Sequence, residues 1–592
     1  MSTRRPASAA EAPVRYRVEA ADRHAHLWRV ILTIDEPAAP QHLALPVWIP
    51  GSYLVREFAR HLQRLSARQH GKPVLLRQLD KSSWQAECQA SEPLEISYEV
   101  YAFDPSVRAA FLDADRGFFN GTSLCLRVQG QEKRAHAIEV ISPVEGWELA
   151  TALLPQKVNR RGFGRYGAAD YDELVDAPFE MGRFWSADFK AGGVPHRLVV
   201  TGAPASFDGE RLLQDTRRVC EAEIRFWHGG AGSRRKPPFG HYLFLLHAVD
   251  DNYGGLEHRH STALIAARRD LPRLGEARAS EGYTTLLGLI SHEYFHTWNV
   301  KQLRPAEFTR YDYGHENYTH LLWFFEGFTS YYDDLFLRRC GLIDEATYLR
   351  LLGKTINQVL QAPGREVQSV AQASYDAWIK YYRADENTPN ATISYYSKGA
   401  LVALCFDLTL RAEGRTSLDA VMRALWARCK GGPMTEADFA AVLRELGGRS
   451  FHREIAAWVH GTRELPLEPL LSACGVQVHH DPAALQQRLG LRTSDSGGLV
   501  TVKTVLRGGA AEQAGLAAGD EWLGVEVAGQ GWRLARLDDL PLYAGPHRKV
   551  VALVARDRRL RRLDLTLPPA ATTWRLSLRD EGLARPWLTG VD

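Results

Sequence analysis

The sequence contains no long hydrophobic run. No stretch reaches the ~18 apolar residues that a membrane-spanning helix needs, so we expect no transmembrane segment and no membrane partner. The first twenty residues, MSTRRPASAAEAPVRYRVEA, carry arginines but lack the apolar core of a signal peptide. Secretion by that route is therefore not expected.

Cysteine is sparse, and its spacing shows no pattern. No two cysteines form a CxxC pair, and the seven positions are Cys88, Cys125, Cys220, Cys340, Cys405, Cys429 and Cys474. An odd, scattered set predicts neither a disulfide framework nor a thiolate metal site. We therefore expect a cytoplasmic protein with reduced thiols.

An excess of charge of either sign is also missing. The chain has 73 Lys and Arg against 70 Asp and Glu, within an ordinary globular composition. This balance gives no support for a nucleic-acid partner bound through a basic surface. One basic run, Arg556 to Arg562, could be a contact patch, although a solvated strand end or hairpin is the favoured interpretation.

The 592 residues change character along the chain and suggest a multidomain protein. Residues 1–170 carry short β-branched and aromatic runs between turn residues, which is typical of a β-sandwich-like domain. Residues 171–460 begin with strand-like runs and continue with long helical patterns, which indicates an α+β domain with a helical C-terminal part. Residues 475–570 form a compact β-rich module, and residues 571–592 are expected to be a C-terminal tail.

The clearest motif is HEYFH, in which His292 and His296 are four residues apart. Residues at this spacing lie one turn apart on the same side of a helix, so both imidazoles can reach one zinc ion. Glu293 lies on an adjacent face, where its carboxylate can take a proton from a water molecule at the metal. The alternative is a pair of capping or surface histidines. The motif predicts a catalytic zinc site.

Such a site needs a third protein ligand, and Glu326 is the best candidate. It lies 30 residues after the second histidine, within the apolar run WFFEGF. A carboxylate in these surroundings is costly to bury unless a cation compensates its charge. The alternative for Glu326 is the exposed edge of an amphipathic helix. His315 and His320 could compete as ligands, but neither has the same apolar setting.

The segments HEYFHTWNVKQLRP and LLWFFEGFTSYY resemble the glycyl-aminopeptidase family of gluzincin zinc metallopeptidases. Residues 45–61, LPVWIPGSYLVREFARH, are similar to a segment of that family's N-terminal domain, and the 475–570 module resembles its PDZ domain. The resemblance implies a β-rich N-terminal domain, a thermolysin-like catalytic domain and a PDZ-like domain. It also implies one zinc ion per chain, held by His292, His296 and Glu326, with Glu293 as the catalytic base.

A second match is the segment Gly254-Gly255-Leu256-Glu257-His258, which resembles the GxMEN-type segment of related aminopeptidases. The resemblance implies an edge strand along the substrate, with Glu257 holding the free α-amino group. A carboxylate suits an ammonium partner, and the two glycines allow a close backbone approach. Leu256 and His258 depart from the usual Met and Asn, and a β-turn before a strand is the alternative.

A third match is Tyr396-Ser397-Lys398-Gly399, which is similar to the YxKG segment of those enzymes. There the tyrosine hydroxyl stabilises the oxyanion of the tetrahedral intermediate, which can lower the activation barrier by about 3 kcal/mol. The neighbouring Tyr395 could be confused with it, and the spacing to Lys-Gly favours Tyr396. Without the resemblance, a Tyr-Tyr pair before a helix is more often core packing.

The PDZ resemblance implies a groove that binds a C-terminal peptide by β-addition. Leu489-Gly490-Leu491 could form its carboxylate-binding loop, and Ala510 to Asp520 its short helix and turn. A packing domain without a ligand is an equal alternative.

Together these residues predict a zinc-dependent aminopeptidase that acts on peptides, with the family name implying a preference for N-terminal Gly or Ala. One alternative is a zinc endopeptidase whose PDZ-like module captures substrates by their C termini. Another is a scaffold without catalysis. The sequence does not fix the oligomeric state.

Overall fold

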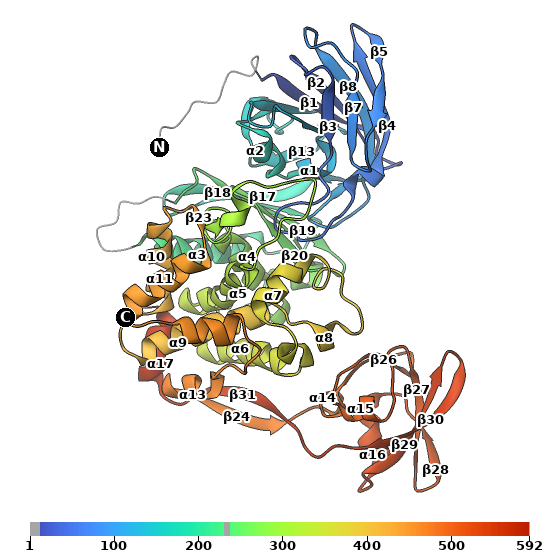
Figure 1. Ribbon diagram of the computed structural model, residues 1–592, viewed down its shortest axis with the longest axis vertical. Helices are drawn as coiled ribbons and strands as arrows, with labels where there is room; N and C mark the ends of the chain where they lie inside the picture. The colour runs from blue at the N-terminus through green and yellow to red at the C-terminus, as the bar shows by residue number, and fades with distance from the viewer. Residues whose placement is uncertain (1–11, 230–236, 591–592) are drawn as a thin grey trace. The chain divides into compact units, whose positions relative to one another are not determined.

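The computed structural model describes residues 12–229 and 237–590 (Figure 1). By their internal contacts the residues form two compact units, Met1–Tyr318 with Trp426–Thr435 and Thr319–Leu425 with Glu436–Asp592. Residues 1–11, within the segment that lacks a signal-peptide core, lie outside the described residues. Within the described ranges no helix is long and apolar enough to cross a membrane.

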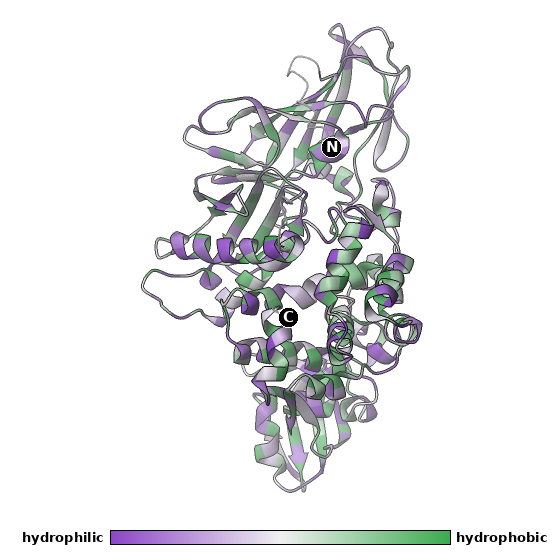
Figure 2. Ribbon diagram, turned by 90° about the vertical axis from the view of Figure 1, so that its left-hand side faces the viewer, coloured by the Kyte–Doolittle hydropathy of each residue, from purple (hydrophilic) through white to green (hydrophobic). Residues whose placement is uncertain are grey.

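The first unit begins with a β-rich domain, as the sequence predicts. Every second residue of β2 is buried, because successive strand residues point to opposite faces. Both hydrophobic and hydrophilic residues occur along the strands of the molecule (Figure 2). The main sheet has the order β14-β15-β12-β1-β2-β8-β4-β5, formed by Leu154–Val158, Gly164–Ala168, His136–Val140, Val14–Asp22, Leu27–Ile34, Leu94–Tyr101, Leu62–Gln69 and Lys72–Val74. Two four-stranded sheets are β13-β16-β10-β9, formed by Glu148–Thr151, Phe179–Gly182, Arg116–Phe119 and Ala110–Leu112, and β11-β3-β7-β6, formed by Arg127–Val128, Gln41–Ala44, Ser83–Ala86 and Leu76–Gln78.

This domain continues past the boundary that the sequence suggested at residue 170. The strand β16 pairs with β10 and with β13, so the small sheet is complete only at Gly182. All four residues of β16 are buried, including a glutamate, and this short FEMG run has no alternation that would mark it as a strand. The preceding helix α2 (Tyr171–Val175) also packs on strands of the main sheet.

A five-stranded mixed sheet follows in the same unit, with the order β17-β18-β19-β21-β20. Its strands are Phe184–Ala191, Val194–Thr201, Tyr242–Val249, Ser261–Ala267 and Gly254–Glu257. The three central strands are parallel, whereas β20 is an antiparallel edge strand paired with β21. The helices α3 (Gly209–His228) and α4 (Glu281–Phe295) pack against each other, and α4 also packs against β20 and β21. The sheet therefore places an edge strand beside α4.

The second unit is mainly helical. Its central contact is between α5 (Leu322–Arg339) and α9 (Ser397–Ala412), both of which are largely buried. Further helices are α6 (Glu345–Leu360), α7 (Val370–Tyr375), α8 (Thr388–Ala391), α11 (Glu436–Gly447) and α13 (Leu467–Ala473), and α10 (Leu418–Arg428) extends across the boundary of the two units.

The unit also contains the compact β-rich module that the sequence predicts. Its sheet has the order β25-β26-β27-β29-β30, and β28 pairs with β27. The strands are Leu491–Ser496, Leu499–Val505, Glu521–Val527, Lys549–Arg556, Arg559–Thr566 and, for β28, Gln530–Arg533, with the short helices Leu485–Leu489, Ala510–Gln513 and Leu540–Ala544 (α14, α15 and α16). The arginine run is a hairpin: Asp557 and Arg558, both with positive φ, connect β29 to β30, which confirms the favoured interpretation.

The segment predicted as a C-terminal tail is instead part of the fold. Residues Thr572–Leu578 form β31, which pairs with β24 (Val476–Pro482), and Glu581–Thr589 form the helix α17. The amide of Asn357 on α6 donates to the carbonyl of Trp574 and accepts from its backbone N–H, at 2.7 and 2.8 Å. Trp587 of α17 is only 1% exposed. The prediction was wrong because β31 and α17 pack on β24 and α5, and the whole β-rich module separates them in sequence from these partners.

Candidate metal centre and substrate site

The helix α4 positions the HEYFH motif. It begins at Ser280, whose hydroxyl oxygen accepts a hydrogen bond from the backbone N–H of Tyr283 at 3.0 Å. His292 and Glu293 lie in its last turn, and His296 caps its C-terminus. Glu293 is 5% exposed and His296 1% exposed, because α4 packs on α3 and on the strands β20 and β21. These packed neighbours hold the side chains in place.

The orientation of His296 is fixed by a backbone carbonyl. Its Nδ1 lies 2.9 Å from the carbonyl oxygen of Asn299, an atom that can only accept a hydrogen bond. The proton is therefore on Nδ1, and the Nε2 lone pair is available to a metal. The ring centroids of His292 and His296 are 4.7 Å apart.

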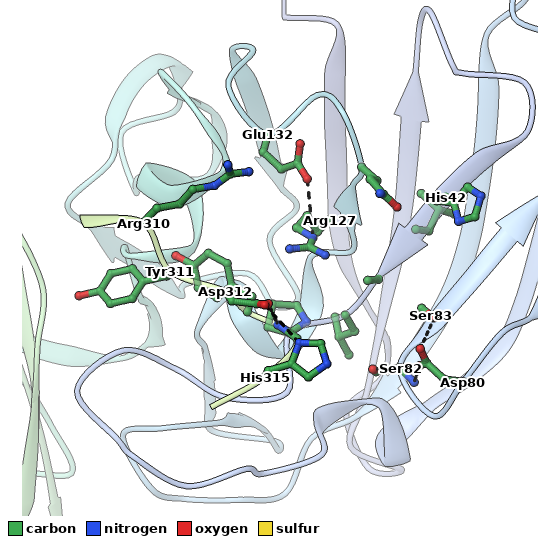
Figure 3. Close-up of a pocket in the computed structure, with 17 residues that line it drawn as sticks. His42, Asp80, Ser82, Ser83, Arg127, Glu132, Arg310, Tyr311, Asp312 and His315 are labelled. Carbon is green, nitrogen blue, oxygen red and sulfur yellow. Dashed lines mark hydrogen bonds and ion pairs between the residues drawn. The ribbon is translucent and has the colours of Figure 1, made fainter. Parts of the chain in front are cut away.

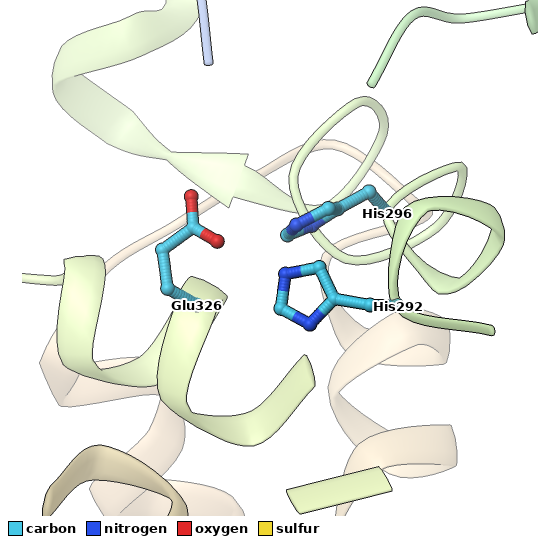
Figure 4. Close-up of side chains that lie close together, drawn as sticks. All are labelled: His292, His296 and Glu326. Carbon is cyan, nitrogen blue, oxygen red and sulfur yellow. The ribbon is translucent and has the colours of Figure 1, made fainter. Parts of the chain in front are cut away.

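The carboxylate of Glu326, on α5, belongs to the same group of donors. One donor atom each from His292, His296 and Glu326 lie within 4.8 Å of one another (Figure 4). Glu326 is 2% exposed, as its apolar sequence context predicts. Two neutral nitrogens and one carboxylate oxygen are the donor set of a catalytic zinc site that keeps an open position. The residues therefore fit a zinc ion.

Neither alternative histidine joins this group among the described residues. The His315 side chain is 81% exposed and lies 3.1 Å from a carboxylate oxygen of Asp312. His320 stacks on Tyr375, with ring centroids 4.6 Å apart. Both interactions are typical of surface histidines.

A second group of donors extends from the first. Atoms of Glu257, Glu293 and His296 also lie within 4.8 Å of one another. Glu257 ends the edge strand β20, and Gly255 of that strand lies directly against Glu293, so that a β-carbon at position 255 would overlap the glutamate carboxylate. The edge strand, rather than the alternative β-turn, is the observed structure.

Two residues outside the predicted set hold Glu257. Gly51, with φ of +94°, lies against its carboxylate: a β-carbon there would be 2.5 Å from Oε2 of Glu257. Lys301 is 4% exposed, and its positive charge faces Glu257 and Asp176. Burial would lower the pKa of Lys301, but these two carboxylates outweigh it and raise the pKa. A buried cation thus supports the negative charge of Glu257.

Asp176 connects the end of the β-rich domain to this cation. It accepts hydrogen bonds from Nζ of Lys301 at 3.3 Å and from the backbone N–H of Arg259 at 2.9 Å, and it lies 3.4 Å from Nδ1 of His258. Burial would raise the pKa of Asp176, but Lys301 and Arg259 outweigh it, and the pKa lies well below its usual value. Apart from the short spacing between His296 and Lys301, no feature of the sequence indicates this network.

Tyr396 precedes α9 in the second unit. Its hydroxyl lies 3.3 Å from that of Tyr382, and its ring stacks with those of Tyr381 and Tyr395. Burial and the negative charge of Glu326 raise the pKa of Tyr396 well above its usual value. The phenol is therefore protonated at neutral pH and can donate a hydrogen bond. Its electrostatic interaction with Glu326 places it near that predicted ligand.

A pocket of about 610 Å³ occurs in the first unit, lined by strands of the β-rich domain and by residues 310–315 (Figure 3). None of the predicted site residues lines it. Arg127 lies 3.9 Å from Glu132, and Asp80 accepts a hydrogen bond from the Ser83 hydroxyl at 2.7 Å. Arg127 and Asp80 therefore each have a partner within the lining of the pocket.

Comparison with known proteins places this site in context. Residues 15–183 match the model of the peptidase M61 N-terminal domain, and residues 285–402 match that of the M61 glycyl aminopeptidase. A crystal structure of an aminopeptidase N family protein from Idiomarina loihiensis is 35% identical, with a TM-score of 0.92, and the alignment covers 97% of this chain and 100% of that chain. A search of curated proteins gave no match.

Two weaker structural matches were also found. An M1 zinc metallopeptidase from Deinococcus radiodurans is 14% identical, with a TM-score of 0.46, and covers 76% of this chain and 95% of that chain. Aminopeptidase A from Legionella pneumophila, in complex with aspartic acid, is 12% identical, with a TM-score of 0.47, and covers 76% of this chain and 49% of that chain. These similarities are too weak to support an inference about function.

The molecule has a β-rich N-terminal domain and a helical catalytic region, and it is a zinc metallopeptidase of the aminopeptidase type. It belongs to the M61 glycyl aminopeptidase family, and zinc is its cofactor.

Proposed function

We propose that His292, His296 and Glu326 hold the zinc ion, that Glu293 is the general base and that Glu257 binds the substrate's α-amino group. The observation that carries this proposal is that the two donor groups share His296. The Glu257 carboxylate, which is suited to an ammonium group, therefore has an oxygen within 4.8 Å of the Glu293 carboxylate, which is suited to a water molecule. Only the first peptide bond of a substrate fits between them, which favours removal of N-terminal residues.

Each side chain has a defined task in this scheme. A zinc ion held by these residues would supply Lewis-acid chemistry, which would polarise the scissile carbonyl and make the attacking water more acidic. Glu293 takes the proton of the attacking water and delivers it to the leaving amine. Glu257 pairs with the ammonium, and the buried positive charge of Lys301 interacts electrostatically with Glu257.

Tyr396 acts on the carbonyl oxygen. Its high pKa keeps the phenol protonated, so that the hydroxyl can donate a hydrogen bond to the negative charge that develops on this oxygen. A preference for N-terminal Gly or Ala is the finer part of the proposal, and its support is the description of the matched family as glycyl aminopeptidases.

The proposal is tested with Glu293→Gln and Glu326→Ala in the full-length chain. Glu293→Gln should retain zinc, measured by elemental analysis, and lose about 10²- to 10⁴-fold in kcat on free-amine peptides. Glu326→Ala should lose zinc. Glu281→Gln, at the exposed start of α4, is the control and should behave as the unchanged protein. Unchanged turnover in Glu293→Gln, or full zinc content in Glu326→Ala, would refute the assignment.

The choice between aminopeptidase and endopeptidase is tested with matched peptides. We expect cleavage of peptides with a free amine and no cleavage after N-acetylation, because an acetylated nitrogen cannot pair with Glu257. Cleavage of acetylated peptides alone would instead favour the endopeptidase alternative. A library of free-amine peptides, assayed with and without a chelator, measures the preference at the first residue.

We also propose that the module of residues 475–570 is a PDZ-like domain. Its strand β25 is a sheet edge, and Gly490, with φ of +69°, lies immediately before this strand, where a carboxylate-binding loop is expected. Binding of a library of C-terminal peptides to the full chain tests whether the edge has a ligand. A change of hydrolysis in the presence of a bound peptide would connect the module to the catalytic site.

A further inference from the structure

The β-rich domain places one arginine over the strand that the substrate is proposed to follow. Arg108 lies between β8 and β9, and its Nη2 donates a hydrogen bond to the carbonyl oxygen of Gly255 at 3.2 Å. A β-carbon on Gly254 would lie 3.5 Å from both terminal nitrogens of this guanidinium. Arg108 therefore covers the first half of the edge strand β20.

The backbone around Arg108 is held by a buried amide. The Nδ2 of Asn120 donates to the carbonyl oxygens of Val107 and Ala109, at 2.9 and 3.2 Å, on either side of the arginine. Asn120 is fully buried. These hydrogen bonds hold the backbone on both sides of Arg108, so less backbone entropy is lost when a ligand binds.

The charge of Arg108 is available to a ligand. In the described part of the chain no carboxylate oxygen lies within 4.0 Å of its guanidinium nitrogens, whereas Arg116 and Arg259 each have such a partner. Its Nε is buried and makes no hydrogen bond. A half-buried guanidinium with unused donors is suited to a carboxylate, which it can bind through two parallel hydrogen bonds.

The order of contacts along β20 gives the direction of the substrate. Glu257 is at the end of the strand, Gly255 lies on Glu293, and Gly254 lies under Arg108. A peptide whose ammonium pairs with Glu257 passes Glu293 and then reaches Arg108. At about 3.3 Å per residue, the three steps from position 257 to position 254 span about 10 Å, which is the length of two to three extended residues.

We infer that Arg108 is a specificity-determining residue that binds a substrate carboxylate two or three residues from the free amine. The inference rests on the proposed function, because it takes Glu257 as the ammonium site. The carboxylate has two possible sources, the C-terminus of a dipeptide or tripeptide and the side chain of an acidic residue after the scissile bond. In either case a short peptide is bound through Glu257 at its ammonium group and through Arg108 at its carboxylate.

The test compares trialanine, trialanine amide and the amide of Ala-Ala-Asp with the zinc-loaded full-length chain and with Arg108→Gln. The unchanged protein should show a kcat/KM at least tenfold higher for trialanine than for its amide, because hydrogen bonds to charged groups are strong. Arg108→Gln should bring this ratio close to one, mainly through KM. The ratio is the readout because a general effect on folding or zinc content cancels in it, so a merely structural arginine would not change it.

The arms of the experiment separate the possible results. Faster cleavage of the Asp-containing amide than of trialanine amide, lost in Arg108→Gln, assigns side-chain carboxylates to the site as well. Arg310→Gln, an exposed arginine of the same unit, should retain the ratio of the unchanged protein. An equal ratio of kcat/KM for trialanine and its amide in the unchanged protein and in Arg108→Gln would overturn the inference. In that case, chelator-sensitive cleavage of the amides would still support the proposed aminopeptidase activity. No cleavage of any free-amine peptide would overturn both.

Discussion

Gly327 of α5 lies directly against Gly399 of α9. A β-carbon on Gly327 would be 2.5 Å from the Cα of Gly399, and one on Gly399 would be 2.9 Å from the Cα of Gly327. Gly327 follows the predicted ligand Glu326, and Gly399 is three residues after Tyr396. Two glycines in contact allow the helix backbones to approach more closely than any other residue pair. The contact therefore sets the separation between the carboxylate and the phenol.

Gly399→Ala should separate these two helices. The new methyl group would lie 2.6 Å from the carbonyl oxygen of Trp323, so the backbone itself must move. We expect a loss of about 1–3 kcal/mol in the free energy of unfolding and at least a tenfold loss of kcat. Ser397→Ala, in the same turn of α9, is the control. Normal kcat in Gly399→Ala would show that the spacing of these helices does not matter for catalysis.

The contact between Gly51 and Glu257 gives a second prediction. Gly51→Ala should displace the Glu257 carboxylate and raise KM for free-amine peptides about tenfold or more, with zinc content unchanged. Because Gly51 has a positive φ, backbone strain alone could also cause an effect. Gly71→Ala is the matched control, since Gly71 has φ of +72° and a methyl group added there would have no other atom within 4 Å. Equal effects of the two substitutions on KM would exclude the contact as the cause.

The sequence predicted that His292, His296 and Glu326 lie close together, but it did not predict what surrounds them. His292, His296 and Glu326 were predictable because residue type, helical spacing and an apolar setting all favour one ion. The residues that hold Glu257 come from segments far away in the chain, and no local pattern indicates that Gly51 or Lys301 would meet it. Their roles depend on tertiary contacts.

The same distinction applies to the fold. The β-branched and aromatic run of β2 and the helical runs of α4 and α5 predicted the class of each region, because those elements bury one face or are buried throughout. The strands β16 and β31 were missed, since β16 has only four residues and both strands pair with strands distant in sequence. Boundaries that depend on such pairings cannot be read from local periodicity.

The ion pair between Asp176 and Lys301 should make the first unit sensitive to acid. The pKa of Asp176 is lower in the folded chain than its usual value of about 3.9, so the carboxylate stabilises the fold above that pH. This contribution is lost as the pH falls through the folded-state pKa. Lys301→Met should cost about 3 kcal/mol at neutral pH, because it removes one of the two cations, Lys301 and Arg259, that compensate this buried carboxylate.

The double variant Asp176→Asn with Lys301→Met identifies the mechanism. It should recover a large part of the stability lost in Lys301→Met, measured by urea unfolding at pH 7. Its stability should also depend less on pH below 4. Additive losses in the double variant would indicate that the two side chains do not act as a pair.

Burial of His136 predicts a second pH dependence, at higher pH. Burial lowers its pKa from 6.5 to about 4, and its Nδ1 lies 2.8 Å from the carbonyl oxygen of Arg134. Its Nε2 is buried without a hydrogen-bond partner, so a proton there would be unsatisfied. Between pH 6.5 and 4 the unfolded chain binds a proton that the folded chain does not, and stability therefore falls as the pH falls, by about 2–3 kcal/mol.

His136→Asn removes this titration while its amide can still donate to Arg134. The variant should be less stable than the unchanged protein at pH 7, because it loses the stacking of the ring on Tyr16. The difference between the two proteins should shrink between pH 6.5 and 4, measured by urea unfolding at several pH values. A difference in stability that stays constant over this range would show that folding does not change the pKa of His136.

The C-terminal helix α17 should be required for the stability of α5. The indole N–H of Trp587 donates to the hydroxyl of Tyr331 at 2.9 Å, and Nη2 of Arg339 donates to the Trp587 carbonyl oxygen at 3.0 Å. Both partners lie on α5, the helix that carries Glu326. Trp587→Ala should therefore cost about 3–5 kcal/mol in unfolding free energy and also weaken zinc retention during dialysis against a chelator. Trp587→Phe keeps most of the buried surface and should cost about 1–3 kcal/mol, the penalty of one lost hydrogen bond. Leu583→Ala, at a position that is 53% exposed on the same helix, should cost little. Zinc retention that is identical in all three variants would show that α17 stabilises the fold without supporting the ligand helix.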